Sequence, residues 1–411
     1  MSKKNTLRPA ESLNPFETHA SEKLVRADRI CLLVLTLLYG LIALLNLGTL
    51  NFPESVYYGD TGDTFTLTFD APVTLAEAWC NGNIATGSLT FTNEEGESWT
   101  YTQDQGDMFK WHKETVDLPV SDTLTVEAEG EVAVNEIAFF DEAGNLLPVT
   151  ASAEGAALVD EQSTVPDRPG YYNGMIFDEI YHARTAYEHI HNMSVYEWTH
   201  PPLGKLIIAL GILIFGMNPF GWRIMGTLFG IAMVPILYVF AKRMLRRTDY
   251  ALLAAGLWAF DCMHFTQTRI ATIDVYGVFF ILLMFLFMYE YIRRPYLTTP
   301  LKEKFRYLAL SGLSFGLGVA SKWIGCYAGA GLAVLFFGHV LAALYRTLRL
   351  EPGEKKQAQL KRFWNVTWKT VLWCCLFFLA LPGGIYFASY IPYYRYEGDT
   401  SLKEAWDTLL Y

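Results

Sequence analysis

The chain has 411 residues, of which 52% are hydrophobic and 18% are charged, and its formal net charge is −10. This composition is too apolar for a disordered chain and too poor in charge for an ordinary soluble enzyme. The acidic balance also argues against a nucleic-acid-binding protein. Residues 51–199 contain 27 Asp and Glu against 4 Lys and Arg, a net charge of −23, whereas the rest of the chain sums to +13. An acidic block therefore lies inside a basic, apolar frame.

The frame contains apolar runs that are long enough to cross a bilayer, which takes about 20 residues. The sequence predicts seven membrane spans, near residues 30–50, 222–241, 250–268, 273–292, 305–320, 323–345 and 370–391. A further apolar run at 204–216 has only 13 residues, so we expect it to lie in, or dip into, one leaflet. The first run has no small-residue cleavage site after it, and we interpret it as an anchor.

Basic residues indicate the orientation of these spans, because Lys and Arg concentrate in cytoplasmic segments. They cluster in residues 1–29, 242–249, 293–304 and 346–369. With these segments inside the cell, the acidic block lies outside it and the short 204–216 helix belongs to the outer leaflet. This predicts a multi-pass protein of the cell membrane with a cytoplasmic N-terminus at 1–29.

The acidic block shows short alternating runs separated by Gly, Asn and Asp. One of them, DTFTLTFD, places Phe65, Leu67 and Phe69 on one face. This pattern predicts an extracytoplasmic antiparallel β-sandwich over 51–165. Two interpretations of this domain are open. It is a folded spacer, or it binds sugar through exposed aromatics such as Trp79, Trp99 and Trp111, most of which are expected in the core. Residues 151–170 are expected to form a linker back to the membrane.

The segment 171–221 carries the first candidate catalytic groups, in an external loop with juxtamembrane helices. Asp178 and Glu179 begin a predicted helix over 178–191, where the helix dipole favours an ionised carboxylate. Such a carboxylate accepts a proton from an incoming hydroxyl, or it merely caps the helix. Asp178 and His182 share a helix face.

The turn His200-Pro201-Pro202 is not helical, because proline restricts itself and its predecessor, and it places Lys205 in the first turn of the short helix. A cation at this position is suited to bind the phosphate of a lipid. The alternative is that the Lys205 side chain extends to the lipid headgroups without a specific ligand. The expected outer ends of the next spans add Asp261, Arg269, Asp274 and Lys322. Ionisable residues at membrane depth are costly and indicate function, although a structural ion-pair network is the alternative.

At these residues the chain resembles the bacterial protein O-mannosyltransferases. The similarity runs from about 171 to 395 and rests on FDEIYHARTAYEHI, HPPLGK, TRIATID and SKW in order. It implies a polytopic α-helical glycosyltransferase that moves mannose from a polyprenyl-phosphate donor to Ser or Thr of secreted proteins. It also implies Asp178 as base, Glu179 as its acidic neighbour, and a set that binds the donor and its phosphate: His200, Lys205, Arg269, Asp274 and Lys322. Tyr181, His182 and Asp261 are expected to support this site.

A single displacement needs one base and cations on the phosphate, so this scheme predicts inversion and requires no metal. The Asp178–Glu179 pair nevertheless offers a place for a divalent ion.

Members of the family continue past the seventh span, so residues 392–411 are expected to start another external loop, with the missing spans lost or on a second chain. Within the membrane module 222–391, transfer of another lipid-phosphate-linked sugar, of the arabinose or aminoarabinose type, is the alternative function. A glycan-binding protein and a transporter are further alternatives.

Overall fold

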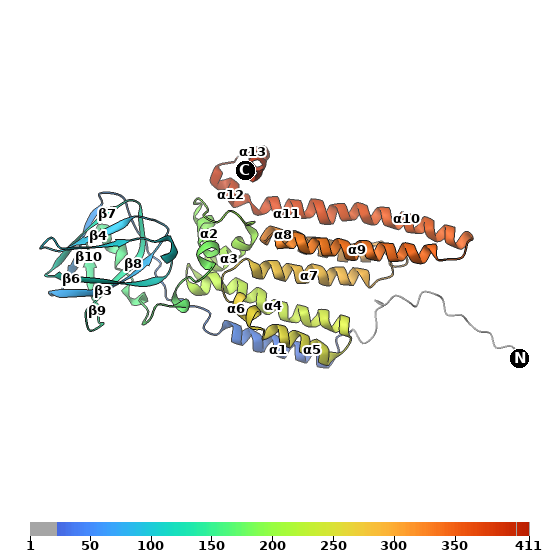
Figure 1. Ribbon diagram of the computed structural model, residues 1–411, viewed down its shortest axis with the longest axis horizontal. Helices are drawn as coiled ribbons and strands as arrows, with labels where there is room; N and C mark the ends of the chain where they lie inside the picture. Colours follow the sequence, from blue (N-terminus) through green and yellow to red (C-terminus); the bar gives the residue numbers. More distant parts are fainter. Residues whose placement is uncertain (1–22, 400, 411) are drawn as a thin grey trace.

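The computed structural model describes residues 23–399 and 401–410 (Figure 1). Most of the predicted cytoplasmic segment, residues 1–22, therefore lies outside the described residues. Figure 1 shows a β-domain at one end and a bundle of long helices at the other. Two short helices, α2 (Glu179–His191) and α3 (Leu203–Phe215), lie between them. Both match helices that the sequence predicts.

The β-domain contains two five-stranded antiparallel sheets. In one sheet the order is β1-β8-β3-β6, with β9 beside β8, over Tyr57–Gly59, Val132–Phe140, Val73–Gly82, Trp111–Val120 and Leu146–Leu147. In the other the order is β10-β2-β7-β4-β5, over Val149–Ala151, Thr64–Phe69, Thr123–Glu129, Ser88–Thr92 and Ser98–Thr102. The prediction of an antiparallel sandwich is confirmed.

Strand β2 shows why these segments form a sandwich. Its residues alternate between exposed and buried, and Phe65, Leu67 and Phe69 all point into the core. The ring of Phe69 lies 6.0 Å from that of Phe139, which comes from the opposite sheet. Alternation with period two buries one face of a strand, so the two apolar faces close on each other. Strand β3 is buried along most of its length and lacks this alternation, and for that reason the sequence did not reveal it.

Two of the three candidate sugar-binding tryptophans are buried where the β-domain meets α2. Trp79 and Trp111 are 4% and 3% exposed, and they belong to a cluster that includes Ala183 and Tyr187 of α2. Trp99 packs against the sandwich core. The expectation that most of these aromatics are core residues is confirmed. The β-domain therefore rests on α2 through an apolar contact.

The predicted linker at 151–170 is more ordered than expected. It forms 3₁₀ turns at Ala153–Leu158 and Gln162–Thr164, and the side chain of Leu158 is fully buried in the sandwich core. The first half of this segment thus completes the β-domain.

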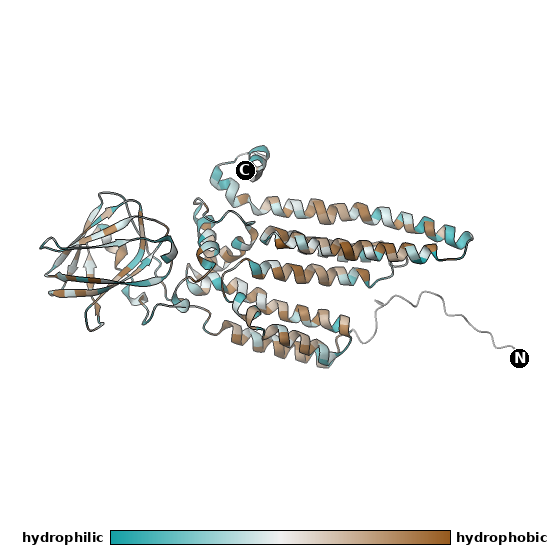
Figure 2. Cartoon of the chain, in the orientation of Figure 1, coloured by the Kyte–Doolittle hydropathy of each residue, from teal (hydrophilic) through white to brown (hydrophobic). Residues whose placement is uncertain are grey.

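Apolar residues dominate the long helices (Figure 2). Five of the described helical stretches are long and apolar enough to cross a membrane. They are α1 (Arg26–Leu44), α4 (Pro219–Leu245), α7 (Asp274–Ile292), α9 (Ile324–Leu348) and the continuous stretch Glu354–Ser389. The chain is thus a multi-pass membrane protein with an inserted β-domain.

Two of the seven predicted spans do not meet this standard. The run at 250–268 is broken into α5 (Thr248–Ala259) and α6 (Cys262–Gln267), because Asp261 caps the second helix by accepting a bond from the His264 amide. Helix α8 (Leu301–Ser321) has 21 residues, but its first turns are charged. The last predicted span begins earlier than expected: α10 (Glu354–Cys375) continues through a π-helical turn into α11 (Leu381–Ser389). Helices α12 (Ile391–Glu397) and α13 (Leu402–Leu410) follow.

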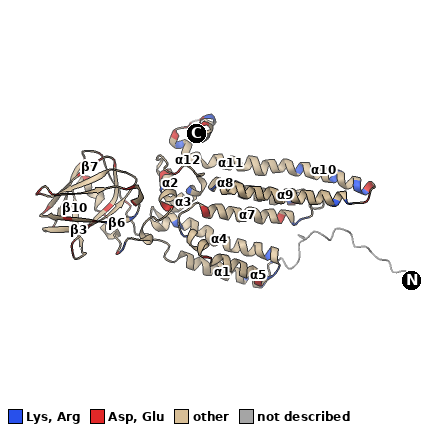
Figure 3. Cartoon of the chain, viewed as in Figure 1, with Lys and Arg blue, Asp and Glu red and all other residues tan. Residues whose placement is uncertain are grey.

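The charges are divided between the two ends of the molecule (Figure 3). Lys and Arg gather at the end of the bundle that lies away from the β-domain. There Lys242 of α4 forms a buried ion pair with Asp28 of α1, at 3.1 Å. This distribution is the one expected when the far end of the bundle is cytoplasmic.

Candidate functional site

The site begins where the chain enters α2. Phe177 has a left-handed backbone (φ 52°) and an exposed side chain, a conformation that is rare for a bulky residue and common at functional positions. Asp178 follows at the N-cap position, but its carboxylate makes no capping hydrogen bond. Partial burial and the charge of Asp274 raise the pKa of Asp178, against the lowering effect of Lys322 and His200. The carboxylate is thus a stronger base than an ordinary aspartate.

Glu179 points elsewhere, although it is the next residue. Its carboxylate is fully buried and accepts hydrogen bonds from Arg223 Nε at 2.7 Å and from Arg223 Nη2 at 2.6 Å. The backbone amides of Ala271 and Ile176 also donate to it. Both oxygens of Glu179 are therefore held by groups other than Asp178.

Asp274 and Lys322 form the second part of the site. Asp274 is the first residue of α7 and Lys322 follows the last residue of α8, and Lys322 Nζ donates to Asp274 Oδ1 at 2.7 Å. Both side chains remain partly exposed. Asp274 and Lys322 lie 48 positions apart in the sequence, and the structure brings these two predicted site residues into direct contact.

Asp178 and Asp274 line one cavity of about 440 Å³. Its walls come from the start of α2 and from α4, α5, α6 and α7. The polar lining includes Asp178, Asp261, His264 and Asp274, whereas Met233, Trp258, Val275 and Val278 make part of it apolar. A mixed lining of this kind fits a ligand with a polar head and an apolar tail.

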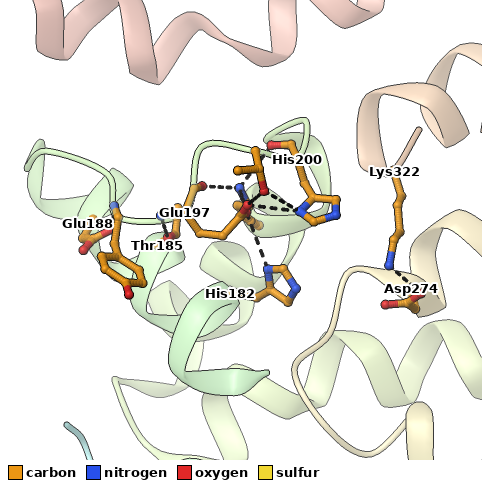
Figure 4. A network of polar contacts seen from close by, with 10 residues as sticks. His182, Thr185, Glu188, Glu197, His200, Asp274 and Lys322 are labelled. Carbon is orange, nitrogen blue, oxygen red and sulfur yellow. Dashed lines mark hydrogen bonds and ion pairs between the residues drawn. The ribbon is translucent and has the colours of Figure 1, made fainter. Parts of the chain in front are cut away.

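Glu197 organises the turn that carries His200 and Lys205 (Figure 4). Its carboxylate accepts a hydrogen bond from Thr199, contacts His200 Nδ1 at 3.0 Å, and forms an ion pair with Lys205. Burial alone would raise the pKa of Glu197, but Lys205 and the hydrogen bonds from Thr199 and His200 lower it to about 2. The carboxylate is therefore ionised at neutral pH.

Lys205 does not present a free cation. Its side chain is 1% exposed, and its ammonium group also donates to the backbone carbonyls of Glu197 and His200. It thus closes the turn around the two prolines. His200 remains more open, with a side chain that is 38% exposed.

The remaining residues of this region tie the turn to α2 (Figure 4). The amide of Tyr196 donates to Glu188, and that of Glu197 donates to Thr185. Tyr181 stacks on Tyr196 with ring centroids 6.1 Å apart. His182 Nδ1 lies 3.9 Å from Glu197, and burial together with the charge of Lys205 lowers the pKa of this histidine to about 4. His182 is therefore neutral at pH 7.

Gly204 allows the short helix α3 to approach the ion pair. A Cβ at this position would lie 2.8 Å from the Ile273 side chain and 3.4 Å from the Ser321 carbonyl oxygen. Ile273 and Ser321 directly precede Asp274 and Lys322. The glycine of HPPLGK thus permits close packing that places His200 near the pair.

Arg269 lies apart from the cavity lining. Its guanidinium donates to the carbonyls of Leu45 and Asn46 at the end of α1 and stacks over Phe265. These contacts hold the end of α1 against the segment that carries Arg269. Asp261 lines the cavity but also caps α6.

Two charged residues of this region, Arg223 and Glu197, escaped the sequence analysis. Arg223 stands inside the apolar run WRIMG, and a lone arginine at membrane depth is itself a signal. Glu197 stands three residues before His200, a spacing that a local search for acid–histidine pairs would have found. Among the described residues, the group of acidic side chains placed to share a metal ion is Glu136, Asp160 and Glu161 in the β-domain, far from Asp178 in the chain.

The geometry described so far defines a multi-pass membrane protein with a cavity, lined by the Asp178 carboxylate, at the end of its helical bundle. Residues 213–393 match the family model described as dolichyl-phosphate-mannose-protein mannosyltransferase. The resemblance to protein O-mannosyltransferases that the motifs predict is therefore confirmed for this part of the chain.

Two mycobacterial relatives agree with this match. The polyprenol-phosphate-mannose–protein mannosyltransferases of Mycobacterium tuberculosis and Mycolicibacterium smegmatis are each 30% identical, over 54% of this chain and 45% of the relative. The chain thus spans about half the length of the curated relatives it matches. The structure of the Saccharomyces cerevisiae protein O-mannosyltransferase Pmt1-Pmt2 complex bound to the sugar donor is 20% identical, with a TM-score of 0.44, over 54% of this chain and 30% of that chain.

Proposed function

We propose that this chain is an inverting glycosyltransferase, or the N-terminal part of one, that moves mannose from a polyprenyl phosphate to Ser or Thr hydroxyls of secreted proteins. The observation that carries the proposal is the position of Asp178: an uncapped carboxylate with a raised pKa that lines a cavity together with Asp274, the ion-pair partner of Lys322. The names of the mycobacterial relatives support mannose as the sugar and a protein as the acceptor.

In the proposed reaction, the Asp178 carboxylate takes the proton of the acceptor hydroxyl as its oxygen attacks C1 of the sugar. The bond from C1 to the phosphate oxygen breaks, and the polyprenyl phosphate leaves with the electron pair. Attack opposite the leaving group converts a β-linked donor into an α-mannoside. No metal or other cofactor is required, because a phosphate leaving group needs only charge neutralisation.

Lys322 is the cation that we assign to the phosphate. It is partly exposed and held by a single carboxylate, Asp274, so an incoming phosphate competes for it directly. His200 is the second candidate, because its ring is more exposed than that of His182. Glu179, Lys205 and Arg269 take positioning roles in this proposal.

The proposed topology has seven spans, with α5–α6 and α8 counted beside the five long apolar helices. The N-terminus is cytoplasmic, and the β-domain and the cavity lie outside the cell membrane. The basic far end of the bundle supports this orientation (Figure 3). A second chain with further spans is a proposed partner, because relatives are about twice as long.

The test is transfer by membranes that contain the full chain, with radiolabelled polyprenyl-phosphate mannose and a Ser/Thr-rich acceptor peptide. We expect labelled peptide, and no labelled peptide from Asp178→Asn. The control, Asp167→Asn, changes an exposed acid in the nearby connector and should keep full transfer. Transfer of arabinose or aminoarabinose from matched donors, with no use of mannose, would replace this proposal by the alternative sugar.

A further inference from the structure

Three carboxylates lie close together where the chain leaves the β-domain. Glu136 lies in the middle of β8, whereas Asp160 and Glu161 lie in the segment that leaves the domain. One oxygen from each of the three lies within 4.8 Å of the other two. Like charges at this separation repel each other unless a proton or a cation lies between them.

The Glu136 side chain points to a ligand. It is 0% exposed, and its Oε1 atom has no hydrogen-bond partner, while Oε2 accepts from the Glu161 amide at 2.9 Å. A buried oxygen without a partner costs free energy. A cation beside Oε1 would supply the partner that this buried oxygen lacks.

We propose that Glu136, Asp160 and Glu161 bind a Ca²⁺ ion. The three side chains offer only carboxylate oxygens, the ligands that hard divalent cations prefer, and no histidine or cysteine that would favour zinc. They come from a strand and a loop, an irregular arrangement that suits the flexible coordination of Ca²⁺ better than the strict octahedron of Mg²⁺. The Ser55 hydroxyl positions two of them, with contacts of 2.7 Å to Asp160 and 2.8 Å to Glu161.

The position of the ion gives it a structural role. Glu161 accepts hydrogen bonds from the backbone amides of Glu54 and Ser55, both at 2.7 Å, so it already joins the segment that enters the β-domain to the one that leaves it. A cation shared with Glu136 ties both connectors to strand β8. The ion thus fixes how the β-domain is joined to the membrane part, separately from the proposed transfer reaction.

The experiment measures the thermal unfolding of the full chain in detergent, first with EDTA and then with increasing Ca²⁺. We expect a melting temperature that rises with the logarithm of the Ca²⁺ concentration above a dissociation constant of about 0.1–1 mM, the range of extracellular calcium modules. Glu136→Gln keeps the shape and removes the charge, so it should fold without Ca²⁺ and lose the response. Glu127→Gln, an exposed glutamate on the other sheet, should keep it.

Direct binding provides an independent readout. Calorimetric titration with Ca²⁺ at pH 7 should show binding to the wild-type chain and none to Glu136→Gln, because the variant lacks one of the three carboxylates. No thermal shift up to about 10 mM Ca²⁺, well above that range, would overturn the proposal. So would an unchanged response in Glu136→Gln or an equal response to Mg²⁺.

Discussion

Glu179 and Arg223 form a fully buried, bidentate ion pair that joins the start of α2 to α4. The guanidinium also donates to the carbonyls of Leu47, Tyr171 and Gly174. Asp178, the neighbour of Glu179, lines the cavity instead. The pair therefore sets the direction in which the proposed base points.

Removing one partner of this pair should destabilise the protein strongly. Arg223→Met leaves a buried carboxylate without its counter-ion, and such losses cost about 3–5 kcal/mol. Glu179→Gln in addition to Arg223→Met should recover part of that loss. Denaturant unfolding in detergent measures both, and a single variant as stable as the wild type would contradict the structural role.

Asp178→Asn should abolish the chemical step while it leaves the fold intact, because the side chain makes no capping bond. Loss of a general base lowers the rate by about 100- to 10,000-fold. The measurement is kcat for mannosyl transfer beside the affinity for the lipid donor. Unchanged affinity with lowered kcat supports a base, whereas unchanged kcat removes Asp178 from the mechanism.

The acid side of the pH–rate profile should report the pKa of Asp178, which depends on the charges of Asp274 and Lys322. Because its pKa is raised, activity should fall with decreasing pH at a higher pH than an ordinary aspartate would give. Asp274→Asn removes a charge that raises this pKa, so the acid side should move to lower pH. Lys322→Met removes a charge that lowers it, so the acid side should move to higher pH. Shifts in the same direction for both variants would contradict this assignment.

Glu197 should make folding stability sensitive to acid. Its pKa in the folded state is depressed from 4.5 to about 2, so its contribution is present above pH 4.5 and is lost as the pH falls toward 2. Glu197→Gln should be less stable than the wild type at pH 7, and the difference should shrink across this window. Melting temperatures between pH 7 and pH 3 measure it, and a constant difference would exclude the Glu197–Lys205 pair as the cause.

Patterns of neighbouring residues in the sequence predict many of the helices and strands. The alternation of DTFTLTFD placed β2, and proline and the apolar run placed α3, because these signals depend on neighbours along the chain. The buried strand β3 and the break between α5 and α6 were missed, since neither follows from apolar periodicity alone.

The sequence by itself determined that this is a membrane protein with an inserted β-domain and an acidic motif ahead of HPPLGK. Only the tertiary structure decided which charges remain available. Glu179, Lys205 and Arg269 each meet a partner or a carbonyl on another element or turn, and for the buried Glu179 and Lys205 such pairing is obligatory. Asp178, Asp274 and Lys322 line or border an open cavity, where incomplete burial leaves a charge able to exchange its partner for a ligand.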